Sequence, residues 1–76
     1  MIDLAILGGR LTAARVKRGL TQAQLGEAAG LRQATVSAIE SGDVRPRPET
    51  IKGLAEALGV SVEWLLGVPD APERSK

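Results

Sequence analysis

Residues 20–42 read LTQAQLGEAAGLRQATVSAIESG, and they carry the most informative pattern in the chain. It predicts two short helices, over residues 22–29 and 33–41. Each is followed by a glycine, which can end a helix in the left-handed conformation. Thr21 is expected to cap the first helix, and Gln24, three positions later, completes a capping box of the T-x-x-Q type. The stretch therefore predicts two helices joined by a tight turn.

Small and apolar residues indicate how these two helices pack on each other. Gly26 and Ala29 are small enough for a close crossing, and Leu31, Val36 and Ile39 are expected to seal it. This is a helix-turn-helix arrangement, in which the second helix can enter the major groove of DNA by its N-terminal end.

The outward face of the second helix carries short polar or small side chains. Its members are Arg32, Gln33, Ala34, Thr35, Ser37 and Ala38. Glutamine can pair with adenine, alanine can contact a thymine methyl group, and hydroxyl groups can bond to bases or phosphates. Thr21 and Gln22 lie at the start of the first helix, where backbone N–H groups can bind a phosphate. The pattern favours DNA recognition over a helical hairpin with a neutral exposed face.

Three further helices are predicted outside this stretch, over residues 4–18, 48–58 and 62–66. No alternation is long enough for a β-strand, so the expected fold class is all-α with five helices. Gly8 and Gly9 are unfavourable inside a helix, and we expect the first helix to fray or to begin later.

The chain is expected to form one domain followed by a short tail. The helix-turn-helix domain is predicted over residues 1–67. Residues 68–76 hold two prolines and mixed charge, and this composition predicts a disordered tail.

The composition excludes several classes of function. The 76 residues contain no histidine and no cysteine, so the usual general base, disulfides and the commonest metal ligands are missing. Glu49, Glu56 and Glu63 are interpreted as a solvated face rather than as catalytic carboxylates. We therefore expect no enzymatic activity, no metal site and no cofactor.

Charge is distributed unevenly along the chain. The net charge is +1, but residues 10–47 hold seven basic and three acidic side chains. This part is the one expected to face phosphate, although an ordinary mixed surface explains the excess equally well. No apolar run approaches the roughly 20 residues of a membrane span, and residues 2–7 do not form a signal peptide. We expect a cytoplasmic protein without a membrane partner.

Four segments together resemble a known family. LGGRLTAAR, GLTQAQLGEAAG, LRQATVSAIESG and ALGVSVEWLLG follow one another between residues 7 and 67. In this order and spacing they are similar to the Cro/C1-type (XRE-like) helix-turn-helix family, which includes lambdoid phage repressors and small bacterial regulators. The resemblance implies a compact five-helix, lambda-repressor-like domain that binds operator DNA.

The resemblance also implies roles for single residues. It makes Gln22 a phosphate contact, and it makes the outward residues of the second helix contacts to bases or phosphates. It implies that Arg45 or Arg47 reaches the DNA backbone or a narrow minor groove. Arg15 and Glu40 match a pair that forms an internal ion pair, so both are expected to be structural.

Three departures from the family pattern change these expectations. Position 32 usually holds a small capping hydroxyl, so Arg32 predicts either a weaker helix start or a contact to guanine or phosphate. Glycine at position 26, where alanine is usual, should cost helix stability. Ala34 and Ala38 are smaller than the usual residues and make fewer direct hydrogen bonds. Methyl contacts and DNA shape should therefore contribute a larger share of the recognition.

The last predicted helix indicates a self-association surface. Trp64 is either a core residue or an anchor of that surface. Val62, Leu65 and Leu66 cannot all point inward from so short a helix, and a symmetric dimer would cover the remaining apolar patch.

The predicted function is a sequence-specific regulator, a repressor or dual regulator, that binds a two-fold operator as a homodimer. One alternative is an antitoxin or protein-interaction subunit of the same fold, with a small protein partner. Another is the N-terminal DNA-binding fragment of a longer repressor.

Overall fold

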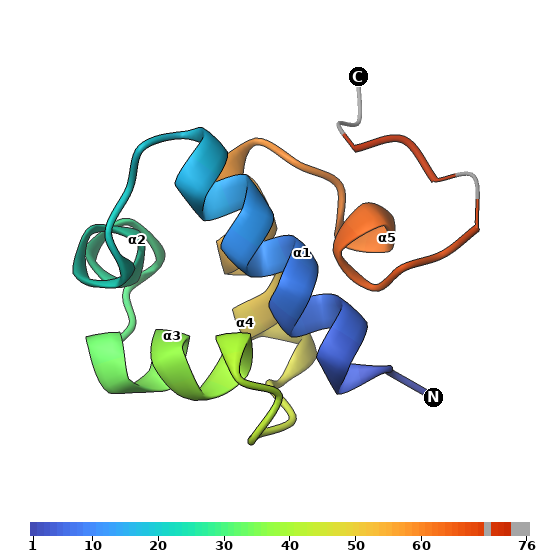
Figure 1. Ribbon diagram of the computed structural model, residues 1–76, viewed down its shortest axis with the longest axis horizontal. Coiled ribbons are helices and arrows are strands. Elements are labelled where there is room, and N and C mark those ends of the chain that lie inside the picture. Colours follow the sequence, from blue (N-terminus) through green and yellow to red (C-terminus); the bar gives the residue numbers. More distant parts are fainter. Residues whose placement is uncertain (70, 74–76) are drawn as a thin grey trace.

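The computed structural model describes residues 1–69 and 71–73, and its regular elements are all α-helices. They are α1 (Leu4–Lys17), α2 (Gln22–Ala29), α3 (Gln33–Glu40), α4 (Pro48–Leu58) and α5 (Val62–Leu65), shown in Figure 1. The all-α, five-helix prediction is confirmed. The helices predicted to end at Arg18, Ser41 and Leu66 each end one residue earlier, and those residues are the C-caps.

Side-chain caps explain where three of the helices begin. The Asp3 carboxylate accepts hydrogen bonds from the backbone N–H groups of Ala5 and Ile6, at 3.0 and 3.1 Å. The Thr21 hydroxyl caps α2, and Ser61 Oγ accepts from the Trp64 N–H at 3.0 Å to cap α5. Each of these bonds satisfies a donor that lacks an acceptor within its own helix.

The expectation that the first helix frays or begins later is wrong. Helix α1 begins at Leu4 and passes through both Gly8 and Gly9 without a break. Gly8 is buried at the crossing of α1 and α3, where a Cβ would meet backbone atoms of Ile39 and Glu40. Packing against α3 therefore offsets the low helix propensity of glycine at this position.

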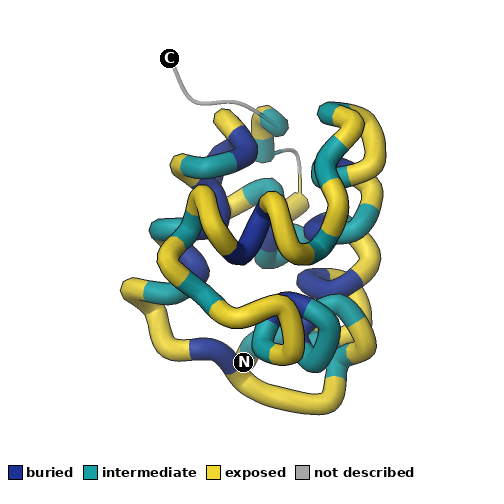
Figure 2. Tube along the Cα trace, turned by 90° about the vertical axis from the view of Figure 1, so that its left-hand side faces the viewer, coloured by how far each residue is buried: buried dark blue, intermediate teal, exposed yellow. Residues whose placement is uncertain are grey.

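Every helix contributes apolar side chains to one core. The buried apolar residues are Leu7, Leu11, Ala14, Leu25, Val36, Ile39, Ile51, Leu54, Ala55, Leu58, Val60 and Leu65. Helix α3 packs on α1 and α2, α4 packs on α2, and α5 packs on α1 and α4. Figure 2 shows the buried positions on the inner sides of the helices. The α2–α3 pair is thus packed against α1 through α3 and against α4 through α2.

The described part of the C-terminal segment contacts α1 and α5. The Ser61 N–H donates to the Glu73 carbonyl at 2.6 Å, and the Ser61 hydroxyl donates to the Pro72 carbonyl. The Glu73 carboxylate lies 3.6 Å from Lys17 Nζ and 3.7 Å from Arg18 Nη2. Residues 70 and 74–76 of the predicted tail lie outside the described residues, and its disorder stays a prediction.

None of the helices in the described part of the chain has both the length and the apolar character needed to cross a membrane.

Candidate nucleic-acid interface

The turn between α2 and α3 brings the two helices close together. Gly30 adopts the left-handed conformation with φ of 72°, and the Leu31 N–H donates to the Gly26 carbonyl at 2.7 Å. A Cβ at Gly26 would lie 2.6 Å from the Leu31 carbonyl oxygen, closer than real contacts allow. Glycine at 26 is thus matched to this tight turn, whatever it costs in helix propensity.

The exposed face of α3 is widest at its N-terminal end. Arg32, Gln33 and Ala34 are exposed, whereas Thr35, Ser37 and Ala38 are half-buried. Val36 and Ile39 lie in the core. All six predicted contact residues therefore keep accessible surface, and the first three are the most accessible to a groove. The Arg32 side chain makes no cap hydrogen bond to α3.

The start of α2 combines a satisfied capping box with an accessible end. The Thr21 hydroxyl accepts from the Gln24 N–H at 3.0 Å, and Gln24 Oε1 accepts from the Thr21 N–H at 2.9 Å. The Thr21 hydroxyl keeps its own proton, which it can donate to an external acceptor. Thr21 is exposed and Gln22 is half-buried.

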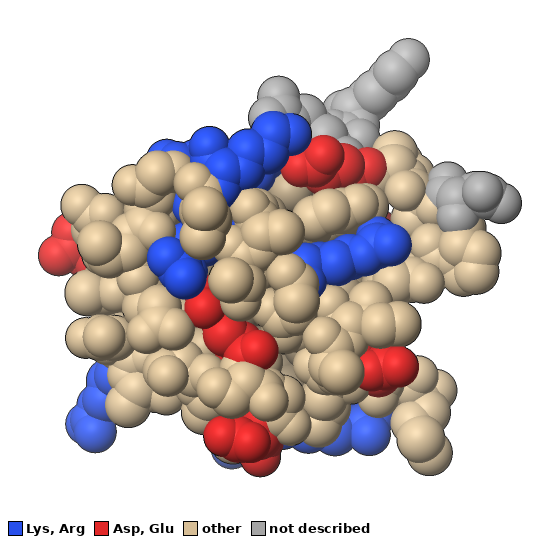
Figure 3. All heavy atoms as spheres, in the orientation of Figure 1, with Lys and Arg blue, Asp and Glu red and all other residues tan. Residues whose placement is uncertain are grey.

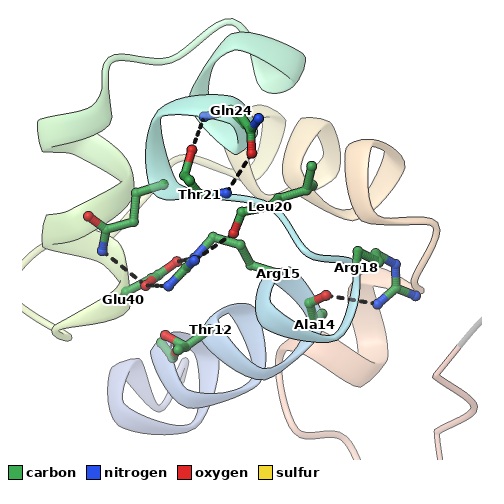
Figure 4. A network of polar contacts seen from close by, with 10 residues as sticks. Thr12, Ala14, Arg15, Arg18, Leu20, Thr21, Gln24 and Glu40 are labelled. Atoms are coloured by element: carbon green, nitrogen blue, oxygen red, sulfur yellow. Dashed lines mark hydrogen bonds and ion pairs between the residues drawn. The ribbon is translucent and has the colours of Figure 1, made fainter.

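Arg15 and Glu40 form an ion pair that joins α1 to α3 (Figure 4). Arg15 Nε donates to Glu40 Oε2 at 2.7 Å, and Nη2 donates to Oε1 at 3.2 Å. The remaining guanidinium nitrogen, Nη1, donates to the Leu20 carbonyl at 2.7 Å. Gln22 Nε2 also donates to Glu40 Oε1, at 3.1 Å. No local pattern of residues indicates this last bond, because its partners are 18 positions apart.

The pKa of Glu40 is set by two opposing effects. Burial alone raises the pKa, because it disfavours the charged form. The hydrogen bonds from Arg15 and Gln22 and the positive charge of Arg15 outweigh burial, so the pKa lies below its ordinary value. Glu40 is therefore ionised at neutral pH and compensated internally, which is why a carboxylate is tolerated at the end of α3.

The loop between α3 and α4 carries the two arginines predicted to reach DNA. Arg45 and Arg47 are both exposed, and Pro46 between them is buried and anchors the loop. Arg47 is also the N-cap residue of α4, through its backbone only. Both guanidinium groups are therefore accessible to a phosphate.

Positive charge does not form one continuous field on the face seen in Figure 3. Lys and Arg side chains occur there at several separate places, with Asp and Glu atoms between some of them. Among the described residues, this face therefore has no broad basic surface.

Helix α5 differs in one respect from the predicted self-association surface. Leu65 has no exposed surface and belongs to the core, so its assignment to that surface is corrected. Val62, Trp64 and Leu66 pack against the core but stay half-buried. Arg10, which the sequence analysis missed, lies over the Trp64 ring at 4.9 Å from its centroid and donates to the Trp64 carbonyl at 2.7 Å.

A family model described as helix-turn-helix matches residues 11–65. The chain belongs to this helix-turn-helix family. The matched region contains all of α2, α3 and α4, and it ends at the last residue of α5. The Gly8 crossing and Arg10 lie just before it.

Two curated relatives of this helix-turn-helix chain are named as repressors. It is 45% identical over 60 residues to the HTH-type transcriptional repressor RghR of Bacillus subtilis, covering 78% of this chain and 44% of RghR. It is 38% identical over 61 residues to the immunity repressor protein of Bacillus phage phi105, covering 80% and 42%. The chain thus spans less than half the length of these curated relatives.

Solved structures share the five-helix fold. The restriction-modification controller protein C.AhdI from Aeromonas hydrophila has a TM-score of 0.80 at 33% identity, covering 83% of this chain and 96% of that one. The P22 c2 repressor, solved with a synthetic operator, has a TM-score of 0.78 at 33% identity, covering 80% and 92%. A chain of the SinR–SinI protein complex has a TM-score of 0.78 at 28% identity, covering 84% of this chain and 63% of that one.

Proposed function

We propose that this helix-turn-helix protein binds double-stranded DNA in a sequence-specific way and regulates transcription from a two-fold operator as a homodimer. The observation that carries the proposal is the exposed N-terminal end of α3, held at a tight turn against α2. In this arrangement α3 enters the major groove and Gln33, Ala34 and Arg32 meet base edges or phosphates. The proposal involves no catalysis and no cofactor.

Phosphate contacts would come from both sides of α3. Thr21 and Gln22 precede it at the start of α2, and Arg45 or Arg47 follows it in the loop to α4. Contacts of this kind set the register and orientation of a protein on DNA, while base contacts supply the specificity. The half-buried Thr35, Ser37 and Ala38 would complete the surface that faces the groove.

The half-buried apolar residues of α5 support the homodimer. Val62 and Trp64 lie on α5 and Leu66 is its C-cap, and Figure 1 places this helix on the opposite side of the molecule from α2. A symmetric contact there would cover apolar surface and leave α2 and α3 accessible. Two copies would then meet half-sites about one helical turn apart. We place this activity in the bacterial cytoplasm, since the named relatives are phage and bacterial proteins.

Selection of bound duplexes from a random DNA pool at physiological salt tests the proposal. We expect enrichment of a two-fold motif with fixed half-site spacing, and a dimer by analytical ultracentrifugation. Binding to all sequences alike, with strong salt dependence and no enriched motif, would contradict sequence-specific regulation. A monomer that enriches a single half-site would contradict the homodimer alone.

A second candidate function is an antitoxin or protein-interaction subunit with a small protein partner. The structural similarity to a chain of the SinR–SinI complex favours it, together with the half-buried α5 residues that a partner could cover. Stoichiometric co-purification of a small protein from the native host, lost when Trp64 is replaced by serine, would support this function.

A further inference from the structure

The Glu40 carboxylate lies where three helices meet. Glu40 is the last residue of α3, its side chain is 7% exposed, and it receives hydrogen bonds from Arg15 on α1 and from Gln22 at the start of α2. Arg15 also holds the Leu20 carbonyl in the turn that leads into α2 (Figure 4). One carboxylate thus connects the end of the proposed recognition helix to the start of the helix before it.

The position of this network follows from the packing of α1. Gly8, Leu11 and Arg15 recur at intervals of three and four residues, so they share one face of the helix. Glycine at position 8 lets the α1 backbone reach the backbone of Glu40, and Leu11 is buried behind it. Arg15, two turns after Gly8, therefore meets the Glu40 carboxylate.

The bond to Glu40 orients the amide group of Gln22. A primary amide nitrogen carries two N–H donors and its oxygen carries none. One donor of Gln22 Nε2 is used by Glu40 Oε1 at 3.1 Å. This bond directs the nitrogen toward the carboxylate, and it leaves the second N–H for an acceptor outside the protein. A side chain held in this way loses less rotamer entropy when it binds.

We infer that Glu40 is a positioning residue for DNA binding, which orients the Gln22 amide so that its second N–H donates to a phosphate oxygen. Arg15 has a complementary part, because it neutralises a carboxylate that would otherwise repel that phosphate. The inference rests on the proposed DNA binding and adds to it the residue that orients the phosphate contact.

A thermodynamic cycle on the purified protein tests the link. Gln22→Met removes the amide at similar length, and the pair Arg15→Met with Glu40→Met removes the network without leaving an uncompensated charge. In the wild type, Gln22→Met should weaken binding to selected and random DNA alike by about three- to tenfold, the value of one hydrogen bond. In the paired background the same change should cost less than about twofold, because the amide is no longer oriented.

A control and two outcomes make the cycle decisive. Gln33→Ala should have the same effect in both backgrounds, since the bases it reads do not depend on the network. Equal losses from Gln22→Met in both backgrounds would overturn the inference while leaving the proposed function intact. A wild type that binds no DNA selectively would overturn both.

A measurement on the free wild-type protein covers the case in which the paired variant does not fold. One Gln22 side-chain amide proton should exchange with water more slowly by NMR than either amide proton of the exposed Gln33. If all four protons exchange alike, the Glu40 bond does not hold Gln22 in solution and the inference falls.

Discussion

Gly8 approaches Glu40 so closely that a Cβ on Gly8 would overlap the Glu40 carbonyl oxygen and lie 2.8 Å from that of Ile39. A Cβ on the adjacent Gly9 would meet no heavy atom within 4 Å apart from its chain neighbours and the backbone of its own helix. Two consecutive glycines in one helix thus have opposite surroundings. The first permits the crossing of α1 and α3, and the second faces open space.

Alanine at these two positions should change stability in opposite directions. Gly8→Ala should lower the free energy of unfolding by about 1–3 kcal/mol, because the two backbones must separate to admit the methyl group. Gly9→Ala should raise it by about 0.5–1 kcal/mol, because alanine is the better helix former and meets nothing. Urea denaturation of both variants checks this, and changes of the same sign would contradict it.

Glu40→Gln should destabilise the protein in a pH-dependent way. Because the pKa of Glu40 is lowered in the folded protein, its stabilising effect is fully present above the ordinary glutamate pKa and is lost as pH falls through the folded value. We expect a loss of about 3 kcal/mol at pH 7, as for one partner removed from a buried pair.

The difference in the free energy of unfolding between Glu40→Gln and the wild type should become smaller as the pH falls below about 4. In that range Glu40 becomes protonated in the unfolded chain before it does so in the folded protein. Denaturation curves of both proteins at pH 7 and at lower pH measure this difference in stability. Glu56→Gln is the matched control, since Glu56 is exposed on α4 and should change stability little at either pH. A constant difference across this pH range would argue against an ionised, buried Glu40.

Gln33→Ala should weaken binding to the selected operator by about 1–3 kcal/mol and relax the preference at one base position. The physical reason is the loss of two hydrogen bonds to one base edge. Titrations with the operator, its single-base variants and random DNA test this. Equal losses on operator and random DNA would show that Gln33 does not read a base.

The salt dependence of DNA binding should distinguish the roles of the two loop arginines. Replacing the one that contacts phosphate by alanine should weaken binding to all sequences and reduce the slope of log K against log salt by about 0.9. The other substitution serves as its control, because it removes the same charge from the same loop. If neither Arg45→Ala nor Arg47→Ala changes the slope, the loop does not contact the DNA backbone.

Arg32→Ser should stabilise the protein while it weakens DNA binding. Arg32 is the N-cap residue of α3 and makes no side-chain cap bond, so a serine hydroxyl there should add about 0.5–1 kcal/mol of stability. The variant would also lack the exposed guanidinium group that is proposed to contact guanine or phosphate in the DNA. Thermal denaturation and DNA titration of one variant measure both effects, and unchanged affinity would leave Arg32 without a role in binding.

Local signals in the sequence were sufficient to predict most helix boundaries. The capping box of Thr21 and Gln24, the cap at Ser61 and the left-handed Gly30 and Gly59 all depend on residues within a few positions of one another. The apolar spacing likewise placed Val36 and Ile39 in the core and left the polar side of α3 outside. Such features depend on short-range hydrogen bonds and on helical periodicity, which the order of residues contains.

Contacts between distant segments were decided only by the tertiary structure. Gly8 was expected to disturb α1 and instead permits the crossing with α3, while Leu65 was expected at a surface and is buried.

The order of residues along the chain predicted five helices, three of them with side-chain caps, and the polar outer face of α3, because caps and periodicity act within one or two turns. Only the packed fold brings Arg10 over Trp64, 54 positions away, and the Gln22 amide onto the Glu40 carboxylate. The physical reason is that these contacts depend on how close two backbones come, which is set by side-chain volumes at the crossings rather than by local propensity.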